Sequence, residues 1–421
     1  MIAQNPSPKV VTCGNGGAKV RVLLSAYGSR GDVEPLAGLA ARLREHGAQV
    51  RVCAPPDEDM ARRLAGIDVP LVPVGPSVRE LARALPSHSS MPQRMAELIA
   101  TQFDVLPAAA RGCDAVAATG GLPAAAGALS VAESLGIRAV SVAFQQHGLP
   151  SPDHRPLAWP TRPFPAGITD NRVLWQRVAR DFTEMFGPAL NASRVAAGLP
   201  PVDDVRGYVR GDRPWLATDP VLDPLWRRPD LAVVQTGAWI LPDDRPLPAA
   251  LETFLAAGEP PVYVGFGSMS MPASTDLADV VIEAVRAHGR RVVLSRGWAD
   301  LTAAHDDCFV VGEANHQVLF QRVAAVVHHG GAGTTMTAAR AGAPQVVVPQ
   351  VIDQPYWAGR VAELGIGVAH DGPVPTAESL TAALGTALSE QTSIRARTVA
   401  GTINPDGTEV AARLLLDPIG R

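Results

Sequence analysis

The chain has 421 residues, of which 47% are hydrophobic and 19% charged, so it is long and apolar enough for two or three domains. A net charge of −4 and an aromatic content of 5% argue against nucleic acid as the main partner. No run of about 18 apolar residues could cross a membrane, and residues 1–18 lack the apolar core of a signal peptide. We therefore expect a cytoplasmic protein without an integral membrane segment.

The four cysteines do not follow the spacing of a metal site or a redox motif. They are Cys13, Cys53, Cys113 and Cys308. We expect them to be reduced, with no role in metal binding or in disulfides.

The first half of the chain alternates between strand-like and helix-like segments. Residues 19–26 read as a strand, residues 28–32 as a turn, and Pro35 as the opening of a helix that Gly47 ends. A second strand at residues 49–54 completes a βαβ unit, which predicts a parallel sheet.

Two proline-rich stretches interrupt this alternation. Residues 147–167 form a stretch whose length is typical of a functional or mobile loop. Residues 223–243 contain several prolines and few helical patterns, and the alternation restarts with a strand at residues 261–266. We therefore place the boundary between two domains at residues 223–243.

A glycine-rich motif at residues 328–335, HHGGAGTT, lies between an apolar strand-like run and a helix-like run. A strand, a glycine turn and a helix start direct backbone N–H groups and the positive end of a helix dipole to one point. The expected ligand is a phosphate or diphosphate, and the alternative is an ordinary turn between a strand and a helix. The expected diphosphate contacts are Ser268, His328, Gly330, Gly331, Ala332, Gly333 and Thr334.

The two histidines of this motif are neighbours, so on an extended chain their side chains point in opposite directions. A single metal ion therefore suits them poorly. One imidazole could donate a hydrogen bond to a phosphate oxygen while the other packs in the protein. We assign the phosphate contact to His328.

Asp353 and Gln354 follow a strand-like run and precede a helix-like run. A carboxylate and an amide supply the acceptors and donors that vicinal sugar hydroxyls need, so we expect them to bind a sugar. The alternative is structural, with Asp353 as the helix N-cap and Pro355 in the first turn.

Asp32 follows the first strand, in a polar glycine-containing turn that a partner domain could face. We expect it to act as a general base toward an acceptor hydroxyl, with Ser29 and Arg30 beside the reacting centre. The alternative is that Asp32 is a helix N-cap.

Together these motifs resemble those of the family-1 glycosyltransferases of GT-B type, over nearly the whole chain from Lys19 onward. In that family the motif at residues 328–335 holds the donor diphosphate, and the pair Asp353–Gln354 contacts the sugar. Residues 24–35, LSAYGSRGDVEP, are similar to the bacterial enzymes that glycosylate glycopeptide antibiotics of the vancomycin and teicoplanin type. Sterol glucosyltransferases share a similar turn. In the glycopeptide branch an aspartate at the position of Asp32 is the catalytic base, where many relatives have histidine.

Two further segments, SRGW at residues 295–298 and NHQ at residues 315–317, resemble the same branch. The resemblance places them near the nucleoside and the diphosphate. The expected nucleoside-side residues are Arg296, Trp298, Val311 and His316. Residues 1–18 depart from the resemblance, because such enzymes begin close to Lys19, and we interpret them as a flexible extension or a wrongly chosen start.

The resemblance implies an α/β fold of GT-B type, with two Rossmann-like domains that face each other across a cleft. Residues 19–222 are then the acceptor-binding domain, residues 223–243 the linker and residues 244–421 the nucleotide-sugar-binding domain, whose last helix could cross back.

The implied reaction moves a sugar, with inversion, from a UDP- or dTDP-sugar to a hydroxyl of a glycopeptide antibiotic aglycone or pseudo-aglycone. No cofactor is expected, and no metal, because no convincing D-x-D motif is present. The alternatives are transfer to another lipophilic natural product or a sterol, a GT-B epimerase of UDP-sugars, and a binding module without turnover. The polar turn at residues 28–32 favours transfer.

Overall fold

The computed structural model describes residues 19–83, 91–159, 161–227, 231–269, 277–298 and 300–417. The predicted N-terminal extension and Cys13 lie outside these residues. The other three cysteines are free thiols. No helix among the described residues has the length and apolar character needed to cross a membrane.

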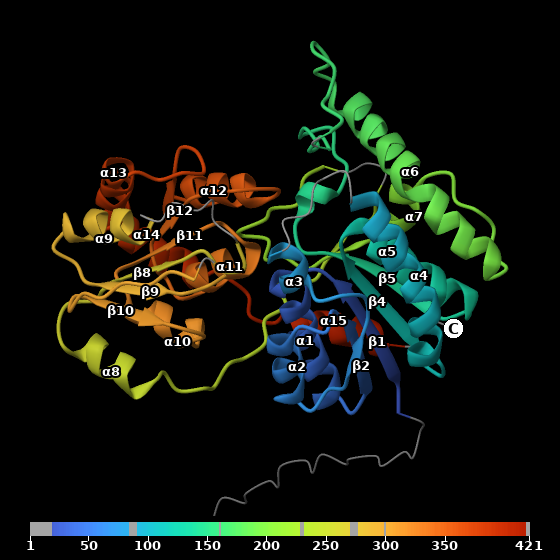
Figure 1. The fold of residues 1–421 in the computed structure, drawn as a ribbon, viewed down its shortest axis with the longest axis horizontal. Helices are drawn as coiled ribbons and strands as arrows, with labels where there is room; N and C mark the ends of the chain where they lie inside the picture. The colour runs from blue at the N-terminus through green and yellow to red at the C-terminus, as the bar shows by residue number, and fades with distance from the viewer. Residues whose placement is uncertain are drawn as a thin grey trace, which may run out of the picture.

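The first domain is built on a seven-stranded parallel sheet in the order β3-β2-β1-β4-β5-β6-β7 (Figure 1). Its strands are β1 Arg21–Tyr27, β2 Gln49–Ala54, β3 Leu71–Pro73, β4 Ala115–Gly120, β5 Arg138–Ala143, β6 Trp215–Leu216 and β7 Val234–Gln235. Its helices are α1 Arg30–Glu45, α2 Glu58–Ala65, α3 Val78–Arg83, α4 Met91–Ala110, α5 Leu122–Ser134, α6 Asn171–Ala196 and α7 Val205–Arg210, with a 3₁₀ turn η2 at Gln146–Gly148.

Alternate residues of the first strand supply the two cores of this domain. Val22 and Leu24 pack into one cluster with α1, whereas Leu23 packs into a second cluster with α4 and α5. A strand buried on both faces reads as a continuous apolar run, which is why the sequence indicated it so clearly.

The second domain is built on a six-stranded parallel sheet in the order β10-β9-β8-β11-β12-β13. Its strands are β8 Val262–Gly265, β9 Val292–Ser295, β10 Cys308–Val311, β11 Ala325–His328, β12 Gln345–Val347 and β13 Gly367–Ala369. Its helical segments are α8 Ala249–Ala256, α9 Leu277–Arg286, α10 His316–Leu319, the 3₁₀ turn η3 Phe320–Arg322, α11 Ala332–Arg340, α12 Gln354–Glu363, α13 Ala377–Ala387 and α14 Glu390–Ala400.

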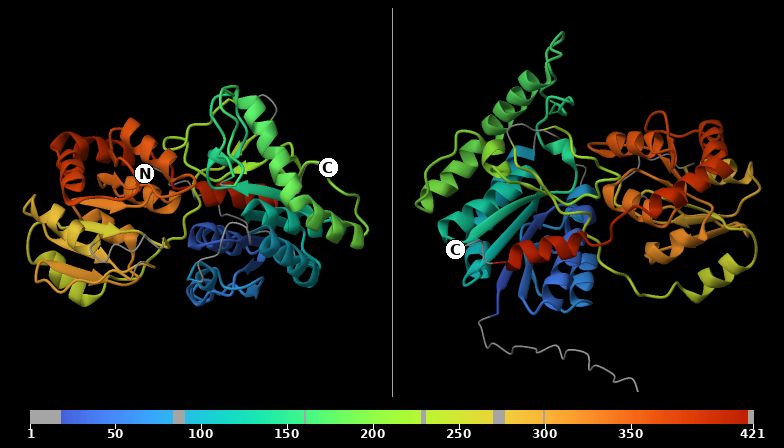
Figure 2. Two further views of the ribbon diagram at one scale, coloured as in Figure 1. Left: turned by 45° about the horizontal axis from the view of Figure 1, so that its top comes forward. Right: turned by 180° about the vertical axis from the view of Figure 1, so that it is seen from behind.

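The last helix, α15 Gly407–Leu416, leaves the second domain and packs on the first (Figure 2). Ala411, Ala412 and Leu415 join the same apolar cluster as α1. The tail and the linker touch where they cross, since a Cβ added at Gly407 would lie 2.3 Å from the carbonyl oxygen of Ala238. Only glycine fits at this crossing.

One sequence expectation about element bounds was wrong. Helix α1 begins at Arg30 rather than at Pro35, because Ser29 is the N-cap and its Oγ accepts from the Gly31 amide at 3.3 Å. The stretch predicted to be the linker, residues 223–243, includes β7, which hydrogen-bonds to β6 as the seventh strand of the first sheet.

Candidate active site

The turn after β11 leaves backbone N–H groups available at the start of α11. Gly331 is the N-cap residue, and Gly330 has a φ of 91°, a conformation that favours glycine. The first bond within the helix runs from the Thr335 amide to the Gly331 carbonyl at 3.0 Å. The amides of residues 332–334 therefore lack partners within the helix, and such a helix start binds anions.

The His328 ring lies buried in the domain. Its Nδ1 accepts from the Gly330 amide at 3.1 Å, so its Nε2 carries the hydrogen and donates to Oε1 of Gln345 at 2.9 Å. Burial lowers the pKa of His328 to about 3, which keeps the ring neutral. Because both nitrogens are engaged and the side chain has no exposed surface, the prediction that His328 contacts the diphosphate is wrong.

His329 is the first residue after β11 and lies beside the helix start. A Cβ added at Gly331 would lie 2.6 Å from Nε2 of His329, and one at Gly267 would lie 2.9 Å from its Cε1. Its Nδ1 is buried without a hydrogen-bond partner among the described residues, and burial lowers its pKa to about 4. His329 is thus the neutral imidazole next to the free amides.

The turns after three neighbouring strands meet at Gly267. The Gly267 carbonyl accepts from the Trp298 amide at 2.9 Å, and a Cβ at Gly297 would lie 2.9 Å from the same oxygen. The carboxyl ends of parallel strands share one sheet edge, which brings these turns together. The structure therefore places Trp298 and the half-buried Ser268 in one region with His329, while Arg296 is exposed.

Two predicted nucleoside-side residues have partners within the second domain. Val311 is 3% exposed and packs in the core, so a nucleoside contact could come only from its backbone. The His316 ring stacks on Phe320 with centroids 4.7 Å apart, and its Nε2 lies 2.9 Å from the Tyr263 hydroxyl. Burial lowers the pKa of His316 to about 4.

Asp353 is the N-cap residue of α12, but its carboxylate makes no capping bond. Its Oδ2 instead accepts from Nε1 of Trp357 at 2.8 Å. Burial raises the pKa of Asp353. The structural alternative is therefore confirmed for the positions of Asp353 as N-cap residue and Pro355 in the first turn, whereas the carboxylate itself does not cap the helix.

Gln354 mainly holds the loop that precedes α12. Its Oε1 accepts from the amides of Gln350 and Val351 at 2.7 and 3.0 Å, and its side chain is buried. Within this loop Ile352 has a φ of 57° and is 64% exposed. A β-branched residue in this conformation is strained, and Gln354 anchors the amides on one side of it. The amide nitrogen of Gln354 lies 3.5 Å from the Met269 sulfur, a weak acceptor.

Asp32 lies in the first turn of α1, and its carboxylate folds back over Gly28. A Cβ at Gly28 would lie 2.0 Å from Oδ2 of Asp32, so any larger residue there would displace this carboxylate. Burial raises the pKa of Asp32 to about 7; hydrogen bonds from Ser29 oppose this increase, and the negative charge of Asp353 adds to it. Because Ser29 is the N-cap, the alternative role of Asp32 as N-cap is wrong.

The electrostatic effect of Asp353 on Asp32 connects the two domains. Asp32 follows β1 of the first sheet, and Asp353 follows β12 of the second. The carboxyl ends of both sheets therefore face one another at these residues, which is where ligands of open α/β sheets bind.

The acid side of the pH profile should report the ionisation of Asp32. Only its deprotonated form can accept a proton, so kcat/KM should fall about tenfold per pH unit below pH 7 and level off above pH 8, given a pKa of about 7. Initial rates from pH 5 to pH 9 would measure this. A rate that stays constant down to pH 5 would contradict the role of Asp32 as base.

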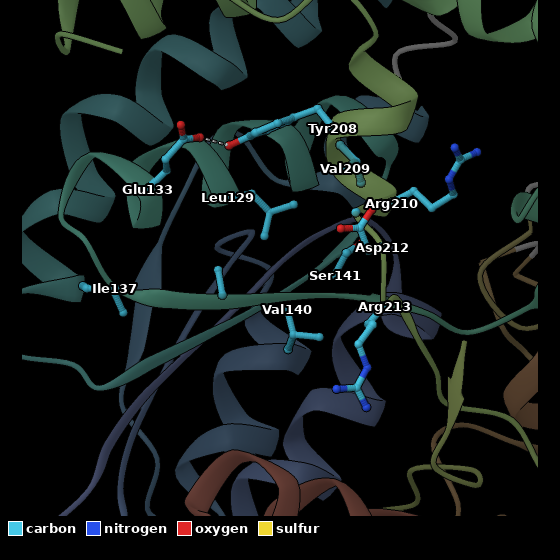
Figure 3. Close-up of a pocket in the computed structure, with 12 residues that line it drawn as sticks. Leu129, Glu133, Ile137, Val140, Ser141, Tyr208, Val209, Arg210, Asp212 and Arg213 are labelled. Carbon is cyan, nitrogen blue, oxygen red and sulfur yellow. Dashed lines mark hydrogen bonds between the residues drawn. The ribbon is translucent and has the colours of Figure 1, made fainter. Parts of the chain in front are cut away.

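Away from this region, a cavity of about 390 Å³ opens beside β5 in the first domain (Figure 3). Its wall includes Glu133, Tyr208 and Asp212, and Figure 3 shows the hydrogen bond from the Tyr208 hydroxyl to Glu133. None of the sequence-predicted site residues lines it.

Two parallel sheets covered by helices, one in each of two domains, are the architecture of GT-B enzymes. Residues 22–145 match the family described as glycosyltransferase family 28 N-terminal domain. Residues 280–415 match the family described as erythromycin biosynthesis protein CIII-like, C-terminal domain.

Named relatives indicate the branch of GT-B enzymes to which the chain is similar. A vancomycin aglycone glucosyltransferase of Amycolatopsis orientalis is 57% identical over 406 residues, which cover 96% of this chain and 98% of the relative. A dTDP-epi-vancosaminyltransferase of the same organism is 54% identical over 409 residues, covering 95% and 98%. The solved structure of the glycosyltransferase of kitacinnamycin aligns with a TM-score of 0.72 at 20% identity, over 95% of this chain and 99% of the other, and shares its fold. The chain belongs to the GT-B family-1 glycosyltransferases, in the vancomycin-type glycopeptide branch.

Proposed function

We propose that this glycosyltransferase moves a sugar, with inversion, from a UDP- or dTDP-sugar to a hydroxyl of a glycopeptide antibiotic aglycone or pseudo-aglycone. The activities named for the relatives support the acceptor class. The observation that carries the mechanism is the half-buried Asp32, whose carboxyl pKa is raised to about 7 by burial and by the negative charge of Asp353 in the other domain. The cytoplasmic location inferred from the sequence remains a prediction.

In this proposal the donor diphosphate lies at the start of α11. The amides of residues 332–334, the hydroxyls of Thr334 and Ser268, and Nε2 of His329 donate hydrogen bonds to it. Because these donors are already in place, they stabilise the negative charge that grows as the diphosphate departs. The Asp353 carboxylate accepts from sugar hydroxyls, and Gln354 keeps Asp353 in position through the loop amides.

Asp32 accepts the proton of the acceptor hydroxyl as the acceptor oxygen attacks the anomeric carbon. The bond between that carbon and the diphosphate oxygen breaks, and the diphosphate leaves from the opposite face. An α-linked donor therefore gives a β-linked product. A phenol, with an ordinary pKa of about 10, is easier for Asp32 to deprotonate than an alkanol.

The acceptor side is expected to include the loop after β5 and the proline-rich stretch that follows it. The Gln146 side chain donates to Oη of Tyr356 at 3.0 Å, and the Tyr356 hydroxyl donates to Asp223 at 2.5 Å. Tyr356 lies two residues after Gln354 on α12, so these bonds join the loop of the first domain to the helix that starts at the sugar site. We propose that residues 149–167, which follow Gln146, select the acceptor next to these hydrogen bonds.

Mass spectrometry of a reaction panel tests the proposed function. We expect one sugar to be added to a glycopeptide aglycone from either a UDP- or a dTDP-sugar, with nucleotide diphosphate released only when the acceptor is present. A sterol and the same aglycone with blocked hydroxyls serve as acceptor controls. Release of nucleotide diphosphate at full rate without acceptor would instead favour an epimerase or hydrolase. Nucleotide binding without any product would favour a binding module.

A further inference from the structure

Six charged side chains form a closed ring of alternating ion pairs between the two domains. The ion-pair ring consists, in order, of Arg30, Glu34, Arg63, Asp243, Arg245 and Glu313. Every arginine contacts a carboxylate on each side, with N–O distances between 2.5 and 3.5 Å. The three positive and three negative charges cancel, so the ring has no net charge.

The first-domain half of the ion-pair ring lies on α2 and on α1, the helix that carries the proposed base. Arg30 and Glu34 lie on α1, and their pair has an N–O distance of 3.4 Å. Asp32 lies between them in the sequence, on the same turn of the helix. Arg63 on α2 donates to Glu34 through Nε at 2.8 Å. Figure 1 shows α1 and α2 on the side of the first domain that faces the second.

The other half of the ion-pair ring is fixed to the second domain. Asn315, the N-cap of α10, donates from Nδ2 to the carbonyls of Asp243 and Arg245 at 2.6 and 2.9 Å. Glu313 lies two residues before Asn315, in the same turn after β10. The segment that carries Asp243 therefore moves with α10, and the pairs Arg30–Glu313 and Arg63–Asp243 cross between the domains.

One end of the ion-pair ring is buried and the other is open to solvent. The side chains of Asp243 and Arg63 are 6% and 15% exposed, whereas those of Glu313 and Arg245 are 41% and 47% exposed. A single exposed ion pair contributes little, but charges in a network are coupled, since removal of one leaves its neighbours unpaired. Removal of the Glu313 charge leaves Arg30 and Arg245 without a partner on that side.

We propose that the ion-pair ring sets the spacing between the domains that transfer requires, with Glu313 as a positioning residue for Arg30 and, through α1, for Asp32. This inference rests on the proposed function, because it assumes that Asp32 must reach an acceptor held against a sugar on the second domain. The ion pairs of the ring include no residue of the glycine turn at residues 330–333, where the proposed diphosphate donors lie, so the ring should affect turnover more than binding of the nucleotide diphosphate.

Neutral substitutions at two ring positions that do not touch each other test this proposal. Glu313→Gln and Arg63→Gln should each lower kcat about tenfold. The affinity of each variant for UDP or dTDP, measured by calorimetry, should stay within about twofold of the wild-type value. In the double variant kcat should fall little further, because either change already opens the same ring. Two effects that multiply, to about a hundredfold, would show that the two residues act independently and would overturn the proposal.

Glu45→Gln is the matched control. It removes a negative charge, as Glu313→Gln does, but from the end of α1, where it breaks the Arg42–Glu45 pair outside the ion-pair ring, so kcat should not change. Salt provides a second readout, because screening reaches the exposed end of the ring. Between 0.05 and 0.5 M NaCl, the wild-type kcat should decrease and approach that of Glu313→Gln; parallel salt dependence of the two enzymes would also overturn the proposal.

The experiments distinguish a wrong proposal about the ion-pair ring from a wrong proposed function. A wild-type chain that transfers no sugar to any glycopeptide acceptor would refute the proposed function. If the wild-type chain transfers sugar but the effects of Glu313→Gln and Arg63→Gln on kcat multiply in the double variant, only the proposal about the ion-pair ring is refuted.

Discussion

Asp32→Asn should lower kcat by roughly 10²- to 10⁴-fold, which is the range for the loss of a general base. The amide has the size of the carboxylate but cannot accept the acceptor proton. Binding of UDP or dTDP should survive, because the proposed diphosphate site lies in the second domain, at the start of α11. Steady-state rates with a glycopeptide acceptor and calorimetry with the nucleotide measure the two quantities separately.

Asp104→Asn, an equivalent change at an exposed position of α4, is the matched control and should leave kcat unchanged. Wild-type turnover by Asp32→Asn would remove Asp32 from the mechanism. The substitution should also abolish the acid limb of the pH profile near pH 7, since the group with a pKa of about 7 is then absent.

The two neighbouring histidines should respond in opposite ways to substitution by alanine. His329→Ala should weaken the affinity for UDP and dTDP about 10- to 100-fold, as expected for a lost hydrogen bond to a charged group, with little change in thermal stability. His328→Ala should instead lower the free energy of unfolding by about 2–4 kcal/mol, because it leaves the Gly330 amide and the Gln345 side chain without partners in a buried site.

Calorimetry and thermal unfolding of both variants distinguish these roles. Unchanged nucleotide affinity in His329→Ala would remove its ring from the diphosphate site. Weak nucleotide binding by a fully stable His328→Ala variant would show that the ring of His328 reaches the ligand after all.

The histidine pair shows what periodicity can predict. Alternation along an extended chain predicts that the two rings point to opposite faces, but β11 ends at His328 and the ring centroids lie 6.4 Å apart, edge to face. Which of the two rings is buried depends on how β11 pairs with its neighbours, where His328 lies opposite Gly265 in β8. Strand register of this kind is a tertiary property, so the sequence alone could not show that His328 is the buried ring.

Other features could be predicted where their signals are local. The βαβ alternation and the glycine turn before α11 depend on neighbouring residues, and the sequence indicated both. The start of α1 was missed because Pro35 resembles a first-turn proline, although Ser29 provides the N-cap earlier. β7 has two residues, too few for a periodic signal.

The ion-pair ring could not be predicted from the sequence at all. Arg30 and Glu313 are separated by most of the chain, and arginine and glutamate are common on any surface. Nothing in the local pattern distinguishes these side chains from solvated ones, since their pairing follows from the docking of two complete domains.

The path of α15 has a practical consequence for building hybrid enzymes. A graft that joins one parent's residues up to the linker to another parent's remaining residues would bring a foreign α15 against the first parent's α1. Ala411, Ala412 and Leu415 would then have to fit an apolar surface that they did not evolve with. Recombination at two points, one in the linker and one just before Gly407, keeps each core with its own parent and should give better-folded hybrids.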